Sequence, residues 1–349
     1  MLNTRMPVEQ LEELAQADRD DRPISRLRGS FGDMGATLAV FAISAVLILA
    51  SRAISPAFGG WGETRAVLVL SSFVIAVGFG QGLVILLGGL DLSVASVMTF
   101  GGILTFSWIG ASWSALIWGL PAILLVTALV GAINGLGITL LRVPPFIMTL
   151  AVGIIVYSIC LGFTAGTPNG QASPILSAIY TQHVLGVPVI VYLMGVAALL
   201  GHLIQSQTPF GRKLHAIGTS EAAAYIAGLG VRRLTIATYA VAGACSGLAG
   251  ILMVGYAGGA TLTMGQPYLL PSIAAVVVGG TSILGGRGSY LGTVGGAILL
   301  TTISTIIGAL EMQEGWRTVI YGAVILLALL LMRDDLLASV QRSVGRALK

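Results

Sequence analysis

Residues 66–87 read AVLVLSSFVIAVGFGQGLVILL, a run of 22 residues without a charged side chain. A helix rises about 1.5 Å per residue, so about 20 apolar residues are enough to cross the hydrocarbon core of a bilayer. Inside lipid the backbone polar groups must be satisfied within the segment, and a helix does this. The run therefore predicts a membrane-spanning helix.

Similar windows recur along the whole chain. The 349 residues are 56% hydrophobic and 9% charged, with a mean hydropathy of +0.94, whereas about a quarter of the residues in a soluble domain are charged. The composition excludes a soluble globular or disordered protein and predicts an all-α polytopic membrane protein of about ten transmembrane helices. The eighth window is short and glycine-rich, which indicates a broken or re-entrant segment. The expected spans are 35–52, 66–87, 92–109, 115–140, 145–164, 188–206, 234–256, 271–284, 290–309 and 317–332.

The distribution of basic residues predicts that both termini are cytoplasmic. Lys and Arg are enriched in short loops on the cytoplasmic side. With the N-terminus inside, the outer loops hold only Arg52, Arg65 and Arg317. The inner loops then hold Arg142, Arg212, Lys213, Arg232, Arg233 and Arg287. We expect a cytoplasmic N-terminal tail (1–33), a transmembrane domain (34–332) and a cytoplasmic C-terminal tail (333–349). Nucleic-acid binding is not expected, because no basic patch interleaves with aromatic residues.

Two connections are too long to be simple turns. Residues 164–187 fall outside and are expected to carry a short surface helix. Residues 207–233 fall inside, and Ser220 followed by Glu221 and three alanines predicts a capped helix near Ser220–Ala227. A short helix on the cytoplasmic face suggests an interaction element; a plain connector is the alternative.

Two glycine-rich segments have similar sequences, which suggests an internal repeat. Residues 84–89 precede Asp91-Leu92-Ser93, and residues 276–280 precede Thr281-Ser282. Transporters often contain repeats with interrupted helices near the transport path, which places Thr281 and Ser282 near the path or its gate. Chance recurrence of small apolar residues, and tight packing at Thr281 and Ser282, remain the alternatives.

The sequence lacks the patterns that carry enzymatic chemistry. There is no His-Glu-x-x-His, no pair of intramembrane carboxylates and no Gly-x-Ser-x-Gly, and the histidines (183, 202 and 215) lie far apart. Gly285-Gly286-Arg287-Gly288 lacks the Gly-Lys-Ser/Thr end of a phosphate-binding loop. We therefore expect no catalytic residue, no metal site and no cofactor on this chain. Cys160 and Cys245 give no disulfide framework.

A few polar residues occupy positions where lipid makes them costly. Asp91 is the only acidic residue between Glu63 and Glu221. An intramembrane carboxylate suggests a functional site, but a cap on a helix that starts at Leu92 fits the spacing better. Asn134 either bonds a neighbouring helix or lines a polar path. Gly131-x-x-x-Gly135 and Gly243-x-x-x-Gly247 predict close helix packing.

Four blocks, in this order, resemble the permeases of ATP-binding-cassette importers of the ribose and simple-sugar group. Gly88-Gly89-Leu90-Asp91-Leu92-Ser93-Val94 resembles their Gly-Gly-Ile-Asp-Leu-Ser-Val signature. Branched-chain amino-acid permeases of the wider superfamily read differently there, so the block favours sugars. The other blocks are Asn134-Gly135 with Pro145-Phe146-Ile147-x-Thr149-Leu150, Thr208-x-x-Gly211-Arg212 running into 216–223, and residues 275–288. Ser220 and Tyr225 depart from the residues usual in the family.

The resemblance implies a multi-pass permease subunit in the bacterial inner membrane. A second permease subunit, identical or paralogous, would complete the pathway for a pentose, hexose or polyol. A periplasmic sugar-binding protein would deliver the substrate, and separate ATPase subunits would bind ATP and Mg²⁺. The runner-up is an ion-coupled secondary transporter that uses Asp91; an intramembrane enzyme is a distant third.

Two groups of candidate site residues result. The candidate pathway or gate residues are Asp91, Ser93, Asn134, Thr149, Thr281 and Ser282. The ATPase-coupling loop is expected to dock through Thr208, Gly211, Arg212, Gly218, Glu221, Ala222, Ala223 and Gly228. Anchoring of the loop at anionic headgroups through its basic residues is the alternative.

Overall fold

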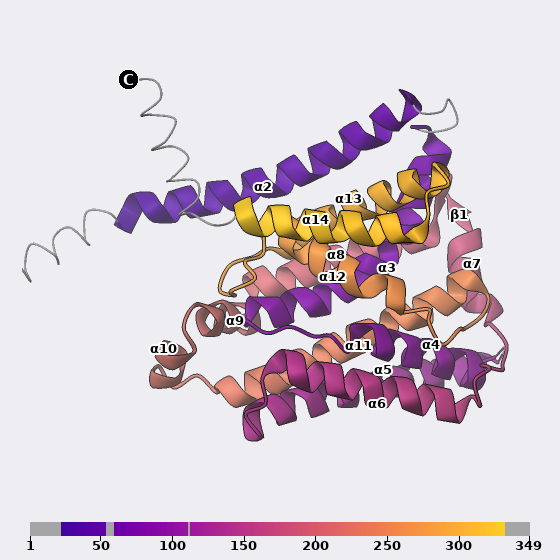
Figure 1. Cartoon of the computed structure of the whole chain (residues 1–349), viewed down its shortest axis with the longest axis horizontal. Helices are drawn as coiled ribbons and strands as arrows, with labels where there is room; N and C mark the ends of the chain where they lie inside the picture. The colour runs from indigo at the N-terminus through magenta and orange to yellow at the C-terminus, as the bar shows by residue number, and fades with distance from the viewer. Residues whose placement is uncertain (1–21, 54–58, 111, 332–349) are drawn as a thin grey trace, which may run out of the picture.

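The computed structural model describes the backbone of residues 22–53, 59–110 and 112–331. Most of these residues form helices that run between two ends of one bundle (Figure 1). One end carries α9 (Pro209–Thr219) and α10 (Glu221–Ile226), and the opposite end carries α7 (Pro174–Thr181) and β1 (His183–Val184). The expected C-terminal tail, 333–349, lies outside the described residues.

Six of the described helices are long and apolar enough to cross a membrane. The class of an all-α polytopic membrane protein is therefore confirmed at this level. The six are α3 (Trp61–Leu86), α5 (Trp113–Leu140), α6 (Pro145–Phe163), α8 (Val189–Gln207), α11 (Val231–Ala257) and α13 (Tyr290–Ala309). The other four expected spans correspond to shorter apolar helical stretches, Thr37–Ala53, Val94–Trp108, Gln266–Val278 and Gly315–Leu327.

These shorter stretches belong to elements whose bounds differ from the expected spans. The first lies in α2 (Arg22–Ala50) and η1 (Ser51–Ala53), so that a helix already runs through the boundary expected at residue 33. The second is α4 (Val94–Trp108), and the fourth lies in α14 (Glu314–Leu331). The third joins η2 (Gln266–Tyr268) to α12 (Leu269–Val278), which ends six residues before the expected boundary at 284.

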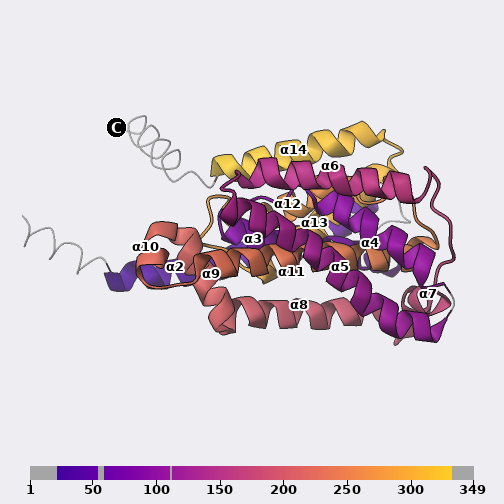
Figure 2. The same ribbon diagram turned by 90° about the horizontal axis from the view of Figure 1, so that it is seen from below.

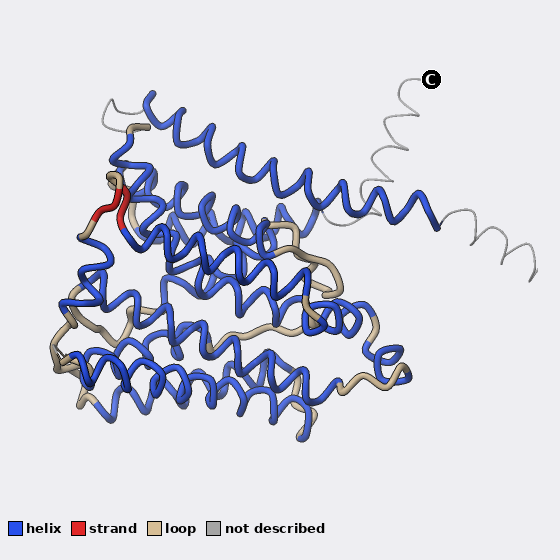
Figure 3. The backbone as a smooth tube through the Cα atoms, turned by 180° about the vertical axis from the view of Figure 1, so that it is seen from behind, coloured by secondary structure: helices blue, strands red, loops and turns tan. Residues whose placement is uncertain are grey.

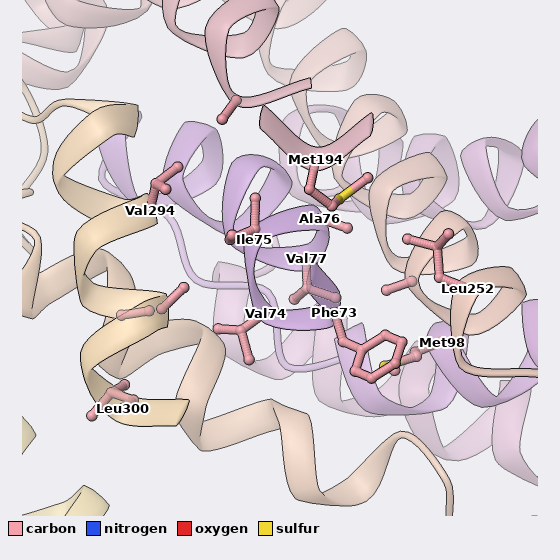
Figure 4. Close-up of a cluster of buried hydrophobic side chains, with 14 of the residues drawn as sticks. Phe73, Val74, Ile75, Ala76, Val77, Met98, Met194, Leu252, Val294 and Leu300 are labelled. Carbon is pink, nitrogen blue, oxygen red and sulfur yellow. The ribbon is translucent and has the colours of Figure 1, made fainter. Parts of the chain in front are cut away.

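The helix α3, which contains most of the apolar run 66–87, lies at the centre of the bundle. Within its apolar window 83% of the residues are buried, and α11, α12, α13, α8 and α9 all contact it. A helix that is apolar all round is a buried helix, and small residues let its neighbours approach. A Cβ added at Gly80, for example, would lie 2.6 Å from the Cα of Ala242. Figure 4 shows the side chains of α3 packed with those of α4, α8, α11 and α13, among them Phe73, Val77, Met98, Met194, Leu252 and Val294.

The outer connection 164–187 contains the expected surface helix, α7. It also contains a hairpin that was not predicted, in which β1 pairs antiparallel with β2 (Val187–Pro188), shown in red in Figure 3. Leu185 and Gly186 both have positive φ (51° and 77°), as a two-residue hairpin turn that matches the twist of the strands requires. Two strands of two residues each in a connecting loop leave the all-α class unchanged.

The inner connection 207–233 folds into two helices rather than one. Thr208 Oγ1 caps α9 by accepting from the Gly211 N–H (3.4 Å), and Ser220 Oγ caps α10 by accepting from the Ala223 N–H (3.3 Å). The cap at Ser220 confirms the prediction from the sequence, whereas α9 was not predicted as a separate helix. Both helices lie at the left end of the bundle in Figure 2, with α10 farther out than α9.

Candidate functional site

The segment between α3 and α4 is a buried, non-helical stretch that contains Asp91. Its carboxylate is 1% exposed, and Oδ1 accepts from the Ser93 N–H (2.8 Å) and from the Ser93 hydroxyl (2.6 Å). Because α4 begins at Val94 with Ser93 as its N-cap residue, Asp91 does not cap a helix that starts at Leu92. Its carboxylate instead closes a turn immediately before the helix.

Two neighbouring helices hold this turn in place. Asn134 of α5 donates from Nδ2 to Ser93 Oγ (2.9 Å), and the hydroxyl oxygen of Thr149 in α6 accepts from the Leu92 N–H (3.0 Å). Both side chains are fully buried. The structure thus brings four of the six expected pathway residues into one hydrogen-bonded cluster, and it shows Asn134 bonding a neighbouring segment.

Buried polar atoms without a partner were missed by the sequence reasoning. Within the described residues, both amide atoms of Gln81 and Asn134 Oδ1 lack a hydrogen-bond partner. The Tyr239 hydroxyl lies beside the Asp91 segment, because a Cβ added at Gly89 would be 2.5 Å from its oxygen. An unpaired buried polar group costs about 1–3 kcal/mol, so Gln81 and Asn134 are costly residues at the centre of the bundle. The sequence did contain one sign of such buried polar atoms, because Gln81 is a polar residue inside the apolar run 66–87.

The second glycine-rich segment ends its helix in the same way as the first. After α12, the Gly280 N–H donates to Val277 O (2.9 Å) and the Thr281 N–H donates to Val276 O (3.1 Å). After α3, the corresponding bonds run from Gly88 to Ile85 O (2.8 Å) and from Gly89 to Val84 O (3.0 Å). Gly88 and Gly280 both have positive φ (81° and 90°), as a Schellman cap requires. The two similar sequence segments therefore end their helices with the same local structure.

These two segments contact one another, and α9 lies on their junction. The Gly286 N–H donates to Leu86 O at the end of α3 (2.9 Å). A side chain at Gly218 of α9 would collide with Leu86 O and the Gly286 backbone, and His215 Nδ1 lies 3.1 Å from Gly286 O. The expected coupling loop therefore contacts the end of α3 and the loop between α12 and α13.

Thr281 and Ser282 lie in this junction and not in the Asp91 cluster. Thr281 is 1% exposed and fills the space beside Gly288, where an added Cβ would clash with its hydroxyl. The Ser282 N–H donates to Arg287 O (2.9 Å), which closes the loop between α12 and α13. Packing therefore accounts for Thr281 in this conformation.

Some of the expected coupling residues are exposed on the surface, and others are buried beneath it. Glu221, Ala222, Ala223, Arg212 and Gly228 are exposed, whereas Gly211 is buried against the Gln205 backbone. Ala224, the third alanine of the predicted capped helix, is 4% exposed and packs with Ile217 and Val231. The surface of α10 instead presents Tyr225 and Ile226, 74% and 86% exposed.

A cavity of about 280 Å³ opens between α3, α12, α13 and α14. Hydroxyl groups and one guanidinium line part of its wall, and they come from Tyr268, Thr301, Ser304, Thr305, Arg317 and Tyr321. None of the expected site residues lines this cavity. The sequence could not predict its polar lining, because the lining residues come together only when the four helices pack. Among the described residues no group of three His, Cys, Asp or Glu side chains is placed to hold a metal ion.

A bundle of apolar helices, interrupted by buried polar segments, defines a multi-pass membrane protein. The chain belongs to the family described as the permease component of the branched-chain amino acid transport system, whose profile matches residues 64–329. No solved structure matches the chain.

Curated relatives point to one branch of this family. The chain is 32% identical to the ribose import permease protein RbsC of Haemophilus influenzae over 289 residues, which are 82% of this chain and 89% of that protein. It is 36% identical to the ribose import permease protein RbsC of Bacillus subtilis over 74% of this chain and 80% of that protein. It is 33% identical to the fructose import permease protein FrcC of Rhizobium meliloti over 81% of this chain and 82% of that protein. The resemblance to permeases of the ribose and simple-sugar group is confirmed.

Proposed function

We propose that this chain is the permease subunit of an ATP-binding-cassette importer for a small sugar. The observation that carries the proposal is the similarity to sugar import permeases over about three quarters or more of the chain. A periplasmic binding protein delivers the sugar, and a second permease subunit completes the pathway. Separate ATPase subunits bind ATP and Mg²⁺ and drive transport.

The distribution of charge supports an orientation in the bacterial inner membrane with both termini in the cytoplasm. Arg65 lies at the end of the bundle that carries the hairpin, where its Nη1 donates to Gly186 O (3.4 Å). The opposite end carries Arg142, Arg232 and Arg233 around one groove, together with Lys213 on α9. Because basic loops stay in the cytoplasm, the α9–α10 end faces inward. With the ten expected spans, both termini then lie on this cytoplasmic side.

Docking of the ATPase on residues 208–231 is supported by the surface of α10 and the contacts of α9. The α10 helix presents Ala222, Ala223 and two exposed apolar side chains to the cytoplasm. Through Gly218, α9 rests on the ends of α3 and the α12–α13 loop. A displacement of the docked helices therefore moves the backbone next to Thr281 and Asp91, which we assign to the gate and the pathway.

A sugar is a suitable substrate for the polar groups inside the bundle. Sugars need many hydrogen-bond partners, which the hydroxyl-lined cavity between α3, α12, α13 and α14 offers. The cluster of Asp91, Ser93, Asn134 and Thr149 holds further polar groups inside the bundle, bonded to one another in this structure. The hydrogen bonds of Asp91 come from the hydroxyl and the one backbone amide of Ser93. This arrangement favours a structural role for its carboxylate over the ion site of a secondary transporter.

The test is reconstitution of the permease with its ATPase and binding protein in proteoliposomes. Ribose, allose and fructose are supplied in turn, and both ATP hydrolysis and uptake of labelled sugar are measured. We expect one sugar to stimulate both in the absence of any ion gradient. Uptake that needs a proton or sodium gradient and ignores ATP would establish the secondary transporter instead.

A further inference from the structure

A groove of about 690 Å³ lies where α5 ends and α11 begins, beside α10. Its charged lining consists of Arg142, Arg232, Arg233 and Glu221. Ile138 and Leu229, both half-buried, form part of its apolar wall. Three guanidinium groups against one carboxylate leave the groove with an excess of positive charge. Among the described residues, none of the three arginines forms an ion pair.

The start of α11 adds to this positive potential. Arg232 and Arg233 are in the first turn of a helix of 27 residues that has no acidic residue there. A helix N-terminus carries a partial positive charge, so cations are disfavoured at this end and anions are stabilised. The N-cap residue is Gly230, which offers no side-chain acceptor, and the Arg232 and Arg233 N–H groups donate to no backbone oxygen. The arrangement suits a bound anion.

Arg142 occupies a backbone conformation that is unfavourable for it. It follows the last residues of α5 with φ 55°, in the left-handed region where glycine or asparagine usually ends a helix. Glycine would adopt this conformation without strain. The guanidinium group is thus held at the rim of the groove despite a local backbone penalty, which is consistent with a binding role for its charge.

We propose that this groove binds the headgroup phosphate of an anionic phospholipid in the cytoplasmic leaflet. The groove lies between the ends of two helices long enough to span the membrane, α5 and α11. Basic pockets at such positions recognise anionic headgroups, and Ile138 and Leu229 provide an apolar wall for the glycerol and upper acyl carbons. The cytoplasmic location rests on the proposed orientation. Tyr225 of α10 also lines the groove, whereas Ile226 does not, so Ile226 is the exposed apolar side chain of α10 that stays available to the ATPase.

Lipid binding is measured on the purified full-length protein in neutral detergent, with fluorescent phosphatidylglycerol and phosphatidylcholine as probes. We expect the wild type to prefer phosphatidylglycerol. The double variant Arg232→Gln/Arg233→Gln loses affinity for it by about fivefold for each charge removed. Lys213→Gln is the matched control, because Lys213 is an exposed basic residue of the same connection that lies outside the groove. It should bind as the wild type does.

Arg142→Gly separates binding from folding. Since it relieves the left-handed strain, it should raise the melting temperature in lipid-free detergent and still weaken phosphatidylglycerol binding about fivefold. Arg142→Lys should retain binding. Equal binding of both lipids by the wild type, or wild-type affinity in all arginine variants, would overturn the proposal. So would unchanged lipid affinity combined with loss of the ATPase on co-purification, which would assign the groove to an acidic protein segment. This assay requires no orientation, so an inverted topology would leave its result intact.

Discussion

Gly243 of α11 lies directly against Gly131 of α5: a Cβ added at Gly243 would be 3.1 Å from the Cα of Gly131. The two glycine pairs, 131 with 135 and 243 with 247, line the contact between these helices, and Cβ atoms added to them would meet backbone or side chain of the facing helix. The packing role predicted for both pairs is confirmed. Two long helices can approach this closely only where neither has a side chain.

Gly243→Ala is therefore expected to lower the stability of the protein by about 1–3 kcal/mol, because the added methyl group forces the two backbones apart. Gly195→Ala in α8 is the matched control, since nothing lies within 4 Å of a Cβ there, and alanine has the higher helix propensity. Thermal unfolding of both variants in detergent is the measurement. Equal melting temperatures for the two variants would show that the α5–α11 contact tolerates separation.

Asp91→Ala is expected to destabilise the protein by about 1–3 kcal/mol, because the buried Ser93 N–H and hydroxyl lose their acceptor. Asp91→Asn keeps an oxygen at the same place and should be milder. Denaturation in detergent and sugar uptake are measured for both variants. If Asp91→Asn is as stable as the wild type yet abolishes uptake or a proton current, the charge itself is used in transport and the structural role is wrong.

Ala223→Trp is expected to prevent retention of the ATPase and coupled uptake while the permease still inserts and folds. Ala223 is exposed on α10, and the change leaves every charge in place. Ala257→Trp, at an exposed position at the other end of α11, is the control and should retain the ATPase. Co-purification at wild-type yield with unchanged uptake would leave headgroup anchoring as the role of this connection.

The orientation can be checked with two single cysteines in a background without Cys160 and Cys245. Leu185 in the hairpin turn is 93% exposed, and Ile226 at the end of α10 is 86% exposed. A membrane-impermeant thiol reagent should label Leu185→Cys in intact spheroplasts. It should label Ile226→Cys only after the membrane is permeabilised, and the reverse pattern would mean that the basic end faces outward.

The transmembrane regions could be predicted from the sequence because span length is a one-dimensional property. The ends of the spans were less accessible. For example, α12 ends at Val278 because Gly280 adopts a left-handed conformation. The hairpin was missed because Leu185, a residue with no turn preference, holds positive φ there.

The candidate site was only partly accessible to the same reasoning. Asp91 and Asn134 could be noticed as polar residues in apolar surroundings, but their link through Ser93 depends on how α5 packs beside α4. Arg142 and Arg232 line the same groove although they are 90 positions apart in the sequence, and no local sequence pattern predicts such a pair. The burial of Ala224 could not be predicted, because a helix of six residues is too short for a periodic pattern to show its buried side.

The enclosure of α3 has a consequence for how the chain tolerates sequence change. On α8 the buried residues are Ile190, Met194, Ala198, Gly201 and Gln205, a single stripe with a spacing of three or four. On α3, by contrast, burial is nearly continuous from Ser71 to Leu86. Substitutions along α8 should therefore alternate between tolerated and harmful with the helical period. Along α3 the harm should be nearly uniform, so related sequences can drift on one side of α8 but have no free side of α3 on which to diverge.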